Sequence, residues 1–155
     1  MENNSIIKGT IATLAIGGTL LFLKKKSDFS KVIQQMTIDV RNIRNLRMKG
    51  TKLYMDIDIA FTNPTQYNMV AYTAGMIKVK QIKLFYKNTL IGSAFSNATK
   101  FELPAKSEFV ITGVTLELLY LDIINQFLGS GIDTNVNNYQ VHTIIEALGK
   151  TWIIE

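Results

Sequence analysis

The chain has 155 residues, of which 47% are hydrophobic and 19% charged, with a formal net charge of +5 and no cysteine. This composition excludes a disordered chain, and the missing cysteine excludes disulfides, thiol nucleophiles, zinc–thiolate sites and iron–sulfur clusters. Residues 1–26 hold four lysines and one glutamate, so residues 27–155 are left nearly neutral, with 13 basic and 11 acidic side chains, which argues against a nucleic-acid-binding protein.

An apolar segment runs over residues 6–23. At about 1.5 Å per residue, its 18 residues reach roughly 27 Å as a helix, which is enough for the hydrocarbon core of a thin bilayer. We therefore expect residues 1–26 to form an uncleaved, single-pass transmembrane anchor. The side chains expected to contact lipid are Ile6, Ile11, Leu14, Ile16, Leu20, Leu21, Phe22 and Leu23.

One lysine lies inside the predicted span and three follow it. Lys8 is close enough to one end for its ammonium to reach the headgroups, and Lys24, Lys25 and Lys26 follow the other end directly. These four side chains are expected to contact anionic lipid headgroups. Because positive residues stay on the cytoplasmic side, the three C-terminal lysines predict that the main domain faces the cytoplasm.

Two other interpretations of this segment remain. A secretory signal peptide places positive charge before its apolar core and a small-residue cleavage site after it, and residues 1–26 have neither feature. A buried helix of a soluble domain is the second alternative. Gly9, Gly17 and Gly18 would weaken such a helix in water, whereas glycine is common in membrane spans.

Residues 27–35 are expected to be a connector or a short extension of the anchor helix, and residues 36–155 one β domain. Strict alternation over 52–62 predicts a strand, which Asn63-Pro64 ends. A phase change near Gln81 predicts a bulge in a strand over 76–86, and Lys87-Asn88 a hairpin turn. Further strands are predicted from residue 36 and over 89–95, 100–103, 108–118 and 139–148.

One helix is predicted in the body, over 119–128, with Gly129 as its stop. The last residues, Thr151 to Glu155, form a short apolar terminus. About six strands with a single helix indicate a mainly β fold, an antiparallel β-sandwich with a helical crossover.

Few residues offer catalytic or metal-binding chemistry. His142 is the only histidine and is expected to be a solvated or hydrogen-bonded strand residue. Asp56 and Asp58 share one face of a strand, a pairing that can bind Ca²⁺ or run acid–base chemistry. The competing interpretation pairs them with lysines of a neighbouring strand, Lys78 and Lys80. We expect no enzyme activity, no cofactor, no metal site and no small-molecule substrate.

Two segments are candidate contacts for a partner. Arg41, Arg44 and Arg47 belong to the densest basic run outside the anchor, which either contacts lipid headgroups, binds nucleic acid or forms a solvated strand edge. Trp152, Ile153 and Ile154 form either a final edge strand or an exposed docking tail.

Residues 36–128 carry several short motifs in a fixed order. A strand ending in Phe61-Thr62-Asn63-Pro64 is followed by Leu84-Phe85-Tyr86-Lys87-Asn88, by Ile91-Gly92, and by Leu103-Pro104-Ala105 opening an apolar strand. In order and spacing these motifs resemble the late embryogenesis abundant type 2 family, the water-stress and hypersensitive-response domain. The resemblance implies an immunoglobulin-like sandwich without enzymatic activity, and the membrane span departs from the soluble members of that family.

These patterns together predict a non-enzymatic, membrane-anchored structural or adaptor protein that binds a protein partner in a larger assembly. One setting is a virion with an internal membrane, such as that of a bacteriophage, in which the domain would link membrane and shell. The alternative is a cellular envelope or stress-protection protein that binds lipid or an apolar ligand between its sheets.

Overall fold

The computed structural model describes residues 26–70, 77–96, 102–119, 121–147 and 149–155. Within these ranges, no helix is both long enough and apolar enough to cross a membrane. The predicted span over residues 6–23, which includes Lys8, and the following Lys24 and Lys25 lie outside the described residues. Lys26 is exposed at the start of a helix over residues 26–35, here called the entry helix, so the predicted connector is helical.

Seven antiparallel strands form one sheet in the order β1-β2-β7-β5-β4-β8-β9, and β3 pairs with β6 in a separate ribbon. The prediction of a mainly β, antiparallel fold is confirmed. The strand bounds are β1 Thr37–Lys49, β2 Lys52–Thr62, β3 Met69–Val70, β4 Ile77–Tyr86, β5 Thr89–Phe95, β6 Glu102–Leu103, β7 Glu108–Leu118, β8 Tyr139–Ala147 and β9 Lys150–Ile154.

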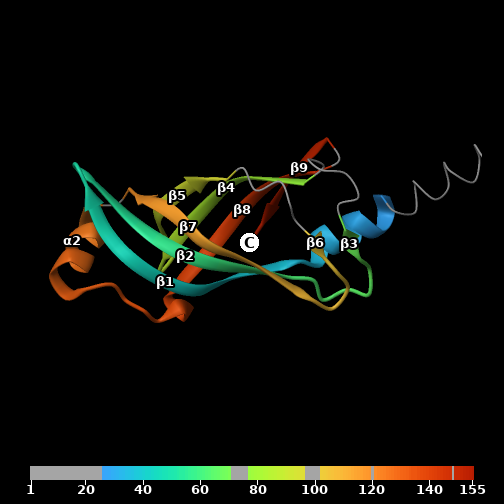
Figure 1. Ribbon diagram of the computed structural model, residues 1–155, viewed down its shortest axis with the longest axis horizontal. Helices are drawn as coiled ribbons and strands as arrows, with labels where there is room; N and C mark the ends of the chain where they lie inside the picture. Colours follow the sequence, from blue (N-terminus) through green and yellow to red (C-terminus); the bar gives the residue numbers. More distant parts are fainter. Residues whose placement is uncertain (1–25, 71–76, 97–101, 120, 148) are drawn as a thin grey trace, which may run out of the picture.

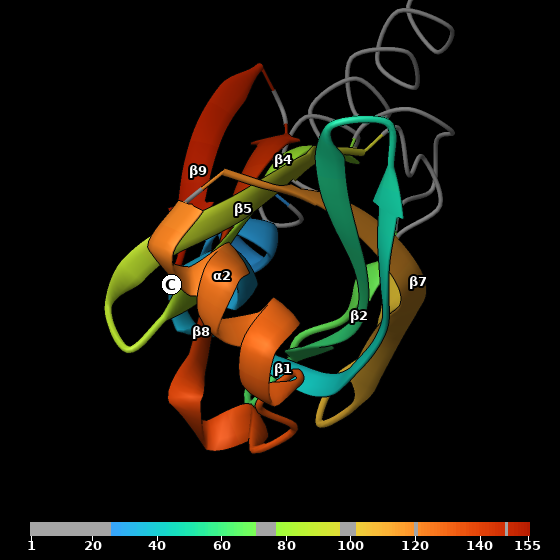
Figure 2. The same ribbon diagram turned by 90° about the vertical axis from the view of Figure 1, so that its left-hand side faces the viewer.

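The sheet curls so that its two halves share one core. Strands β1, β2 and β7 form one half, and β5, β4, β8 and β9 form the other; the two halves stand on opposite sides of the core in Figure 2. The link between them is narrow, because β5 and β7 pair only at Gly92↔Leu118 and Ser93↔Glu117. A Cβ at Gly92 would stand 3.0 Å from the carbonyl oxygen of Glu117, so this close approach requires glycine.

Alternation in the sequence accounts for the core. The β2 side chains predicted to share a face, Leu53, Met55, Ile57, Ile59 and Phe61, are all buried. The predicted bulge near Gln81 is confirmed by the register shift between Val79 and Gln81 in the β4–β8 pairing. Lys87 and Asn88 both have positive φ, as a tight two-residue hairpin requires.

The helix of the body, α2 (Leu121–Ser130), begins and ends two residues later than predicted. Gly129 lies inside it rather than ending it, and the last turn is closed by the Gly131 N–H, which donates to the Phe127 carbonyl at 2.9 Å. Phe127 packs edge-on against Tyr86, with ring centroids 5.4 Å apart. A 3-10 helix, η1 (Val136–Asn138), which the sequence patterns did not predict, leads into β8.

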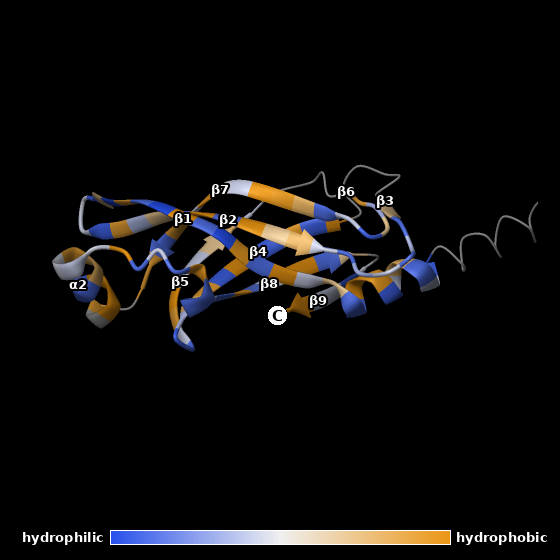
Figure 3. Ribbon diagram, turned by 90° about the horizontal axis from the view of Figure 1, so that it is seen from below, coloured by the Kyte–Doolittle hydropathy of each residue, from blue (hydrophilic) through white to orange (hydrophobic). Residues whose placement is uncertain are grey.

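The molecule is elongated, with its two helical ends far apart. The entry helix lies at the end where β1, β4, β7 and β9 begin, and α2 lies at the opposite end in both Figure 1 and Figure 3. Val32 and Ile33 of the entry helix are buried in the same core cluster as the sheet. The entry helix is therefore an integral part of the β domain.

Candidate functional site

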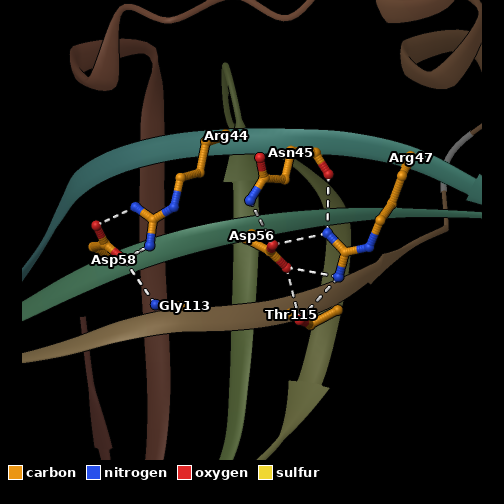
Figure 4. Close-up of polar contacts among 7 residues, drawn as sticks. All are labelled: Arg44, Asn45, Arg47, Asp56, Asp58, Gly113 and Thr115. Carbon is orange, nitrogen blue, oxygen red and sulfur yellow. Dashed lines mark hydrogen bonds and ion pairs between the residues drawn. The ribbon is translucent and has the colours of Figure 1, made fainter.

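A ladder of arginines and aspartates crosses the outer face of β1 and β2 (Figure 4). Arg47 holds Asp56 in a two-pronged contact, with Nη1 2.8 Å from Oδ2 and Nη2 2.9 Å from Oδ1. Arg44 holds Asp58 in the same way, with Nη2 2.7 Å from Oδ1 and Nη1 on Oδ2. The pairing of β1 beside β2 brings these side chains together, because Arg44 stands opposite Asp56 in the register.

Strand β7 supplies further donors to both carboxylates. Thr115 donates its hydroxyl to Asp56 at 2.7 Å, and the Gly113 N–H donates to Asp58 at 2.7 Å. Gly113 has φ of +69° beside a register shift in the β2–β7 pairing, a backbone conformation that glycine adopts without steric cost. The bulge on β7 thus turns a backbone donor toward the ladder.

These contacts fix the charge of both aspartates. The hydrogen bonds from Arg47, and to a lesser extent those from Thr115 and Asn45, lower the pKa of Asp56 to about 2. The hydrogen bonds from Arg44 and Gly113 likewise lower the pKa of Asp58. Both carboxylates are ionised at neutral pH with their oxygens already occupied, which suits neither a general acid nor a cation site.

The prediction that Asp56 and Asp58 pair with Lys78 and Lys80 is wrong. Strand β2 lies between β1 and β7, so the lysines of β4 are not its neighbours. Lys80 pairs instead with Glu146 on β8, at 2.7 Å. Within the described ranges, no group of acidic and histidine side chains is arranged to hold a metal ion.

The basic run predicted from the sequence lies on β1, an edge strand of the sheet. Arg41 forms an ion pair with Glu108 of β7, while Arg44 and Arg47 are committed to the ladder. Each of the three arginines therefore has a carboxylate partner within the domain. Their role as contacts for another molecule stays a prediction.

The candidate partner contacts near the C-terminus, Trp152, Ile153 and Ile154, lie on β9, which is the edge strand on the other side of the sheet from β1. Ile154 is buried in the core, Trp152 is half-buried against it, and Ile153 points outward with 64% of its surface exposed. The segment is an edge strand, and only Ile153 of the three is free to contact another molecule. On the neighbouring strand, His142 stacks on Phe85 with ring centroids 4.4 Å apart and faces Glu155 at 3.7 Å.

Sequence reasoning missed a surface that depends on which strands are neighbours. Ile153 of β9 stands opposite Ile144 of β8, Ile144 opposite Gln81 of β4, and Gln81 opposite Phe95 of β5. Cross-strand partners point to the same side of a sheet. We call Phe95, Ile144 and Ile153 the apolar row. The phase change near Gln81 was the sequence feature that could have indicated this surface, because the bulge places Gln81 on the outer face of the sheet.

A second exposed apolar group surrounds α2. Leu119, Leu121 and Leu128 each expose half or more of their surface at the end of the molecule opposite the entry helix. Leu119 and Leu128 recur at helical spacing with Ile123, Ile124 and Phe127, the pattern from which the helix was predicted. Only Phe127 is fully buried, while Ile123 and Ile124 are half-buried against the core.

Comparison with protein-family models and with curated proteins gives no match for this chain. Functional inference therefore rests on the residues and their geometry.

Proposed function

We propose that the chain is a non-enzymatic, membrane-anchored adaptor whose β domain is held in a fixed pose at the membrane surface and contacts a protein partner. The observation that carries this proposal is the entry helix. This helix comes directly after the predicted span and the lysines that follow the span. Its residues Val32 and Ile33 are 0% and 2% exposed in the domain core. A membrane span that continues into a helix packed in the domain core fixes the distance and the orientation of the domain relative to the membrane.

The distance between membrane and domain follows from chain length. Val32 in the core lies nine positions after Leu23, the last residue of the predicted span. As a helix they reach roughly 14 Å, so the domain lies against the headgroups rather than on a flexible stalk. Lys31 adds a second contact between the entry helix and the domain, because its Nζ lies 4.7 Å from the centre of the Tyr67 ring.

The opposite end is the proposed partner-facing end. The elongated domain carries α2 away from the entry helix (Figure 1). Leu119, shortly before α2, and Leu121 and Leu128 within α2 are exposed. Exposed leucines on a helix are typical of contacts between proteins. We propose an immunoglobulin-like sandwich related to the late embryogenesis abundant type 2 family, placed between an internal membrane and the shell of a virion.

The arginine–aspartate ladder argues against acid–base chemistry at Asp56 and Asp58. Each carboxylate is occupied by an arginine and a donor from β7. A catalytic carboxylate needs a free oxygen to take up or release a proton.

Mass spectrometry of purified particles and of cell membranes from the source tests the proposal. We expect the uncleaved N-terminal peptide, beginning at Met1, at a fixed copy number per particle. Recovery from cell membranes alone would contradict the virion setting and favour the envelope protein. Cleavage after Leu23 would contradict the anchor itself.

A further inference from the structure

The outer face of the four-strand half carries the apolar row across all four of its strands. Phe95 on β5 is 84% exposed and Ile153 on β9 is 64% exposed, at the two ends of the row. Between them lie Gln81 of β4 and the half-buried Ile144 of β8. Three strand spacings separate the ends, so the row is about 14 Å wide. Exposed apolar side chains in one group are typical of a contact with another protein surface.

The charges on this face are divided between its strands. Lys78, Lys80 and Lys83 of β4 lie on it, and so do Glu146 of β8 and Glu155 directly after β9. Lys78 stands opposite Glu146 in the register, and Lys80 binds Glu146 at 2.7 Å. The positive charges are therefore on β4, and the negative charges are one and two strands away, so the charge on the face is nearly balanced.

This division makes the face complementary to itself. A two-fold axis that runs along the strands between β4 and β8 places β4 of one copy over β8 of a second copy, and β5 over β9. Phe95 then meets Ile153 of the second copy, and Lys78 meets Glu146 of the second copy. Each contact occurs twice, because a two-fold axis repeats every contact. Sheets pack face to face in this way with their strands crossing at about 30°.

The direction of this axis agrees with a shared membrane. The strands run roughly along the long axis of the domain, which has the entry helix at one end and α2 at the other (Figure 1, Figure 3). An axis along the strands keeps both entry helices at one end and both α2 helices at the other. Antiparallel pairing of β9 with β9 of a second copy would instead turn the two entry helices to opposite ends.

The size of the face sets the strength of the contact. Four strands at their usual spacing are roughly 19 Å wide, and the seven residues of β5 are roughly 23 Å long, which gives a footprint on the order of 400 Å². Each partner in a stable complex buries about 800 Å². The contact is therefore weak in solution, and anchors that confine both copies to one surface raise their effective concentration.

We propose that the outer face of β5, β4, β8 and β9 binds the same face of a second copy of this chain anchored in the same membrane. The apolar rows of the two copies meet at the centre, and the lysines of β4 lie over the glutamates of the second copy. The α2 end of each copy stays free for the partner of the proposed function. The inference rests on that proposed function, since the shared anchor sets the orientation and the concentration of the two copies.

Cross-linking between cysteine variants tests the inference, because the natural chain has no cysteine. Phe95→Cys and Ile153→Cys chains are prepared at full length, with Thr112→Cys as an exposed control on β7. They are reconstituted alone and as equal mixtures, at the same total amount of protein, into vesicles of phosphatidylcholine with phosphatidylglycerol. Flotation is measured first, and the disulfide-linked dimer is measured after oxidation with copper phenanthroline.

We expect the mixture of Phe95→Cys and Ile153→Cys chains to give several-fold more linked dimer than either variant alone. The two-fold axis brings position 95 over position 153 of the second copy and keeps identical positions about 14 Å apart. Mixtures with Thr112→Cys should give only the yield of random collisions. Equal yields in all samples, or no dimer in chains that float, would overturn the inference and assign the row to a different protein. The highest yield from Ile153→Cys alone would overturn it in favour of β9 edge pairing.

Exchanging charges tests the register of the contact. Lys78→Glu in the Phe95→Cys chain should lower the yield of the mixture several-fold, because it places two carboxylates together. Adding Glu146→Lys to the Ile153→Cys chain should restore the yield. A yield that does not fall, or that does not recover, would overturn the pairing on which the inference depends. Failure of the chains to float would contradict the anchor and the proposed function, so the two proposals fail in distinguishable ways.

Discussion

Asp56 and Asp58 show how single residues on this sheet have their charge fixed by neighbours. Each aspartate sits at the centre of the three-strand half, between an arginine from β1 and a donor from β7. A paired charge of this kind contributes to stability only while the carboxylate is ionised. The ladder therefore links the stability of the domain to pH.

Replacing Asp56 by Asn should weaken the dependence of the domain's stability on pH. The pKa of Asp56 falls from 3.8 to about 2 on folding, so its contribution is complete above about pH 5 and is lost progressively as the pH falls through the folded-state pKa. We expect Asp56→Asn to lower the free energy of unfolding by roughly 1–2 kcal/mol at pH 7, since the pair is partly screened by solvent. Urea titrations at pH 7 and pH 2.5 check this, and an undiminished difference at pH 2.5 would contradict the assignment.

Thr143 is a buried residue whose hydroxyl is not used. Its side chain is 0% exposed on the inner face of β8, and Oγ1 has no hydrogen-bond partner among the described atoms. Burying an unsatisfied hydroxyl costs about 1–3 kcal/mol. Thr143→Val, which replaces the hydroxyl by a methyl group, should raise the melting temperature, and Thr143→Ser, which keeps the hydroxyl and loses the methyl group, should lower it. A lower melting temperature for Thr143→Val would show that the hydroxyl has a partner.

At the scale of elements, one buried side chain joins two segments that are far apart in the sequence. Asn63, at the end of β2, donates through Nδ2 to the carbonyls of Tyr67 and Pro104, at 2.8 and 2.9 Å. Its Oδ1 accepts from the Thr65 hydroxyl at 2.7 Å. The Asn-Pro motif that ends the predicted strand is therefore also the attachment point for the turn before β7.

Asn63→Asp should disrupt this junction. A carboxylate at this position would face carbonyl oxygens where the amide donates, with a cost on the order of 3 kcal/mol or a failure to fold. Asn68→Asp is the matched control, since the exposed Asn68 uses only its Oδ1, which accepts from the Ala105 N–H at 2.8 Å. We expect the control to change the free energy of unfolding by less than about 0.5 kcal/mol. Similar losses in both variants would contradict the account.

Local pattern predicted the elements better than it predicted their neighbours. The bounds of β2, β5 and β7 follow directly from alternation and turn residues, because these signals act within a few positions of the chain. The partners of Asp56, and the alignment of Phe95 with Ile144 across Gln81 of β4, depend on strand order. That order is set by long-range pairing, such as the narrow contact at Gly92, for which a single sequence contains no local signal.

At the scale of the whole molecule, the two ends of the domain differ in character. One end is closed by the entry helix with Val32 and Ile33 in the core, and the other carries α2 with its exposed leucines. An elongated domain with a rigid attachment at one end is suited to holding a partner at a set distance from a membrane. In the proposed function, the entry helix is the link between the predicted anchor and the β domain.

The measurement that tests this account most directly is flotation of the full-length chain with phosphatidylcholine–phosphatidylglycerol vesicles, followed by an alkaline carbonate wash. The natural chain should float and remain with the vesicles after the wash, because an 18-residue apolar helix resists extraction. A Leu14→Arg/Leu20→Arg variant should be lost from the vesicle fraction, whereas Leu14→Ile/Leu20→Ile should behave like the natural chain. Release of the natural chain by carbonate, or retention of the arginine variant, would contradict the claim that residues 6–23 anchor the domain.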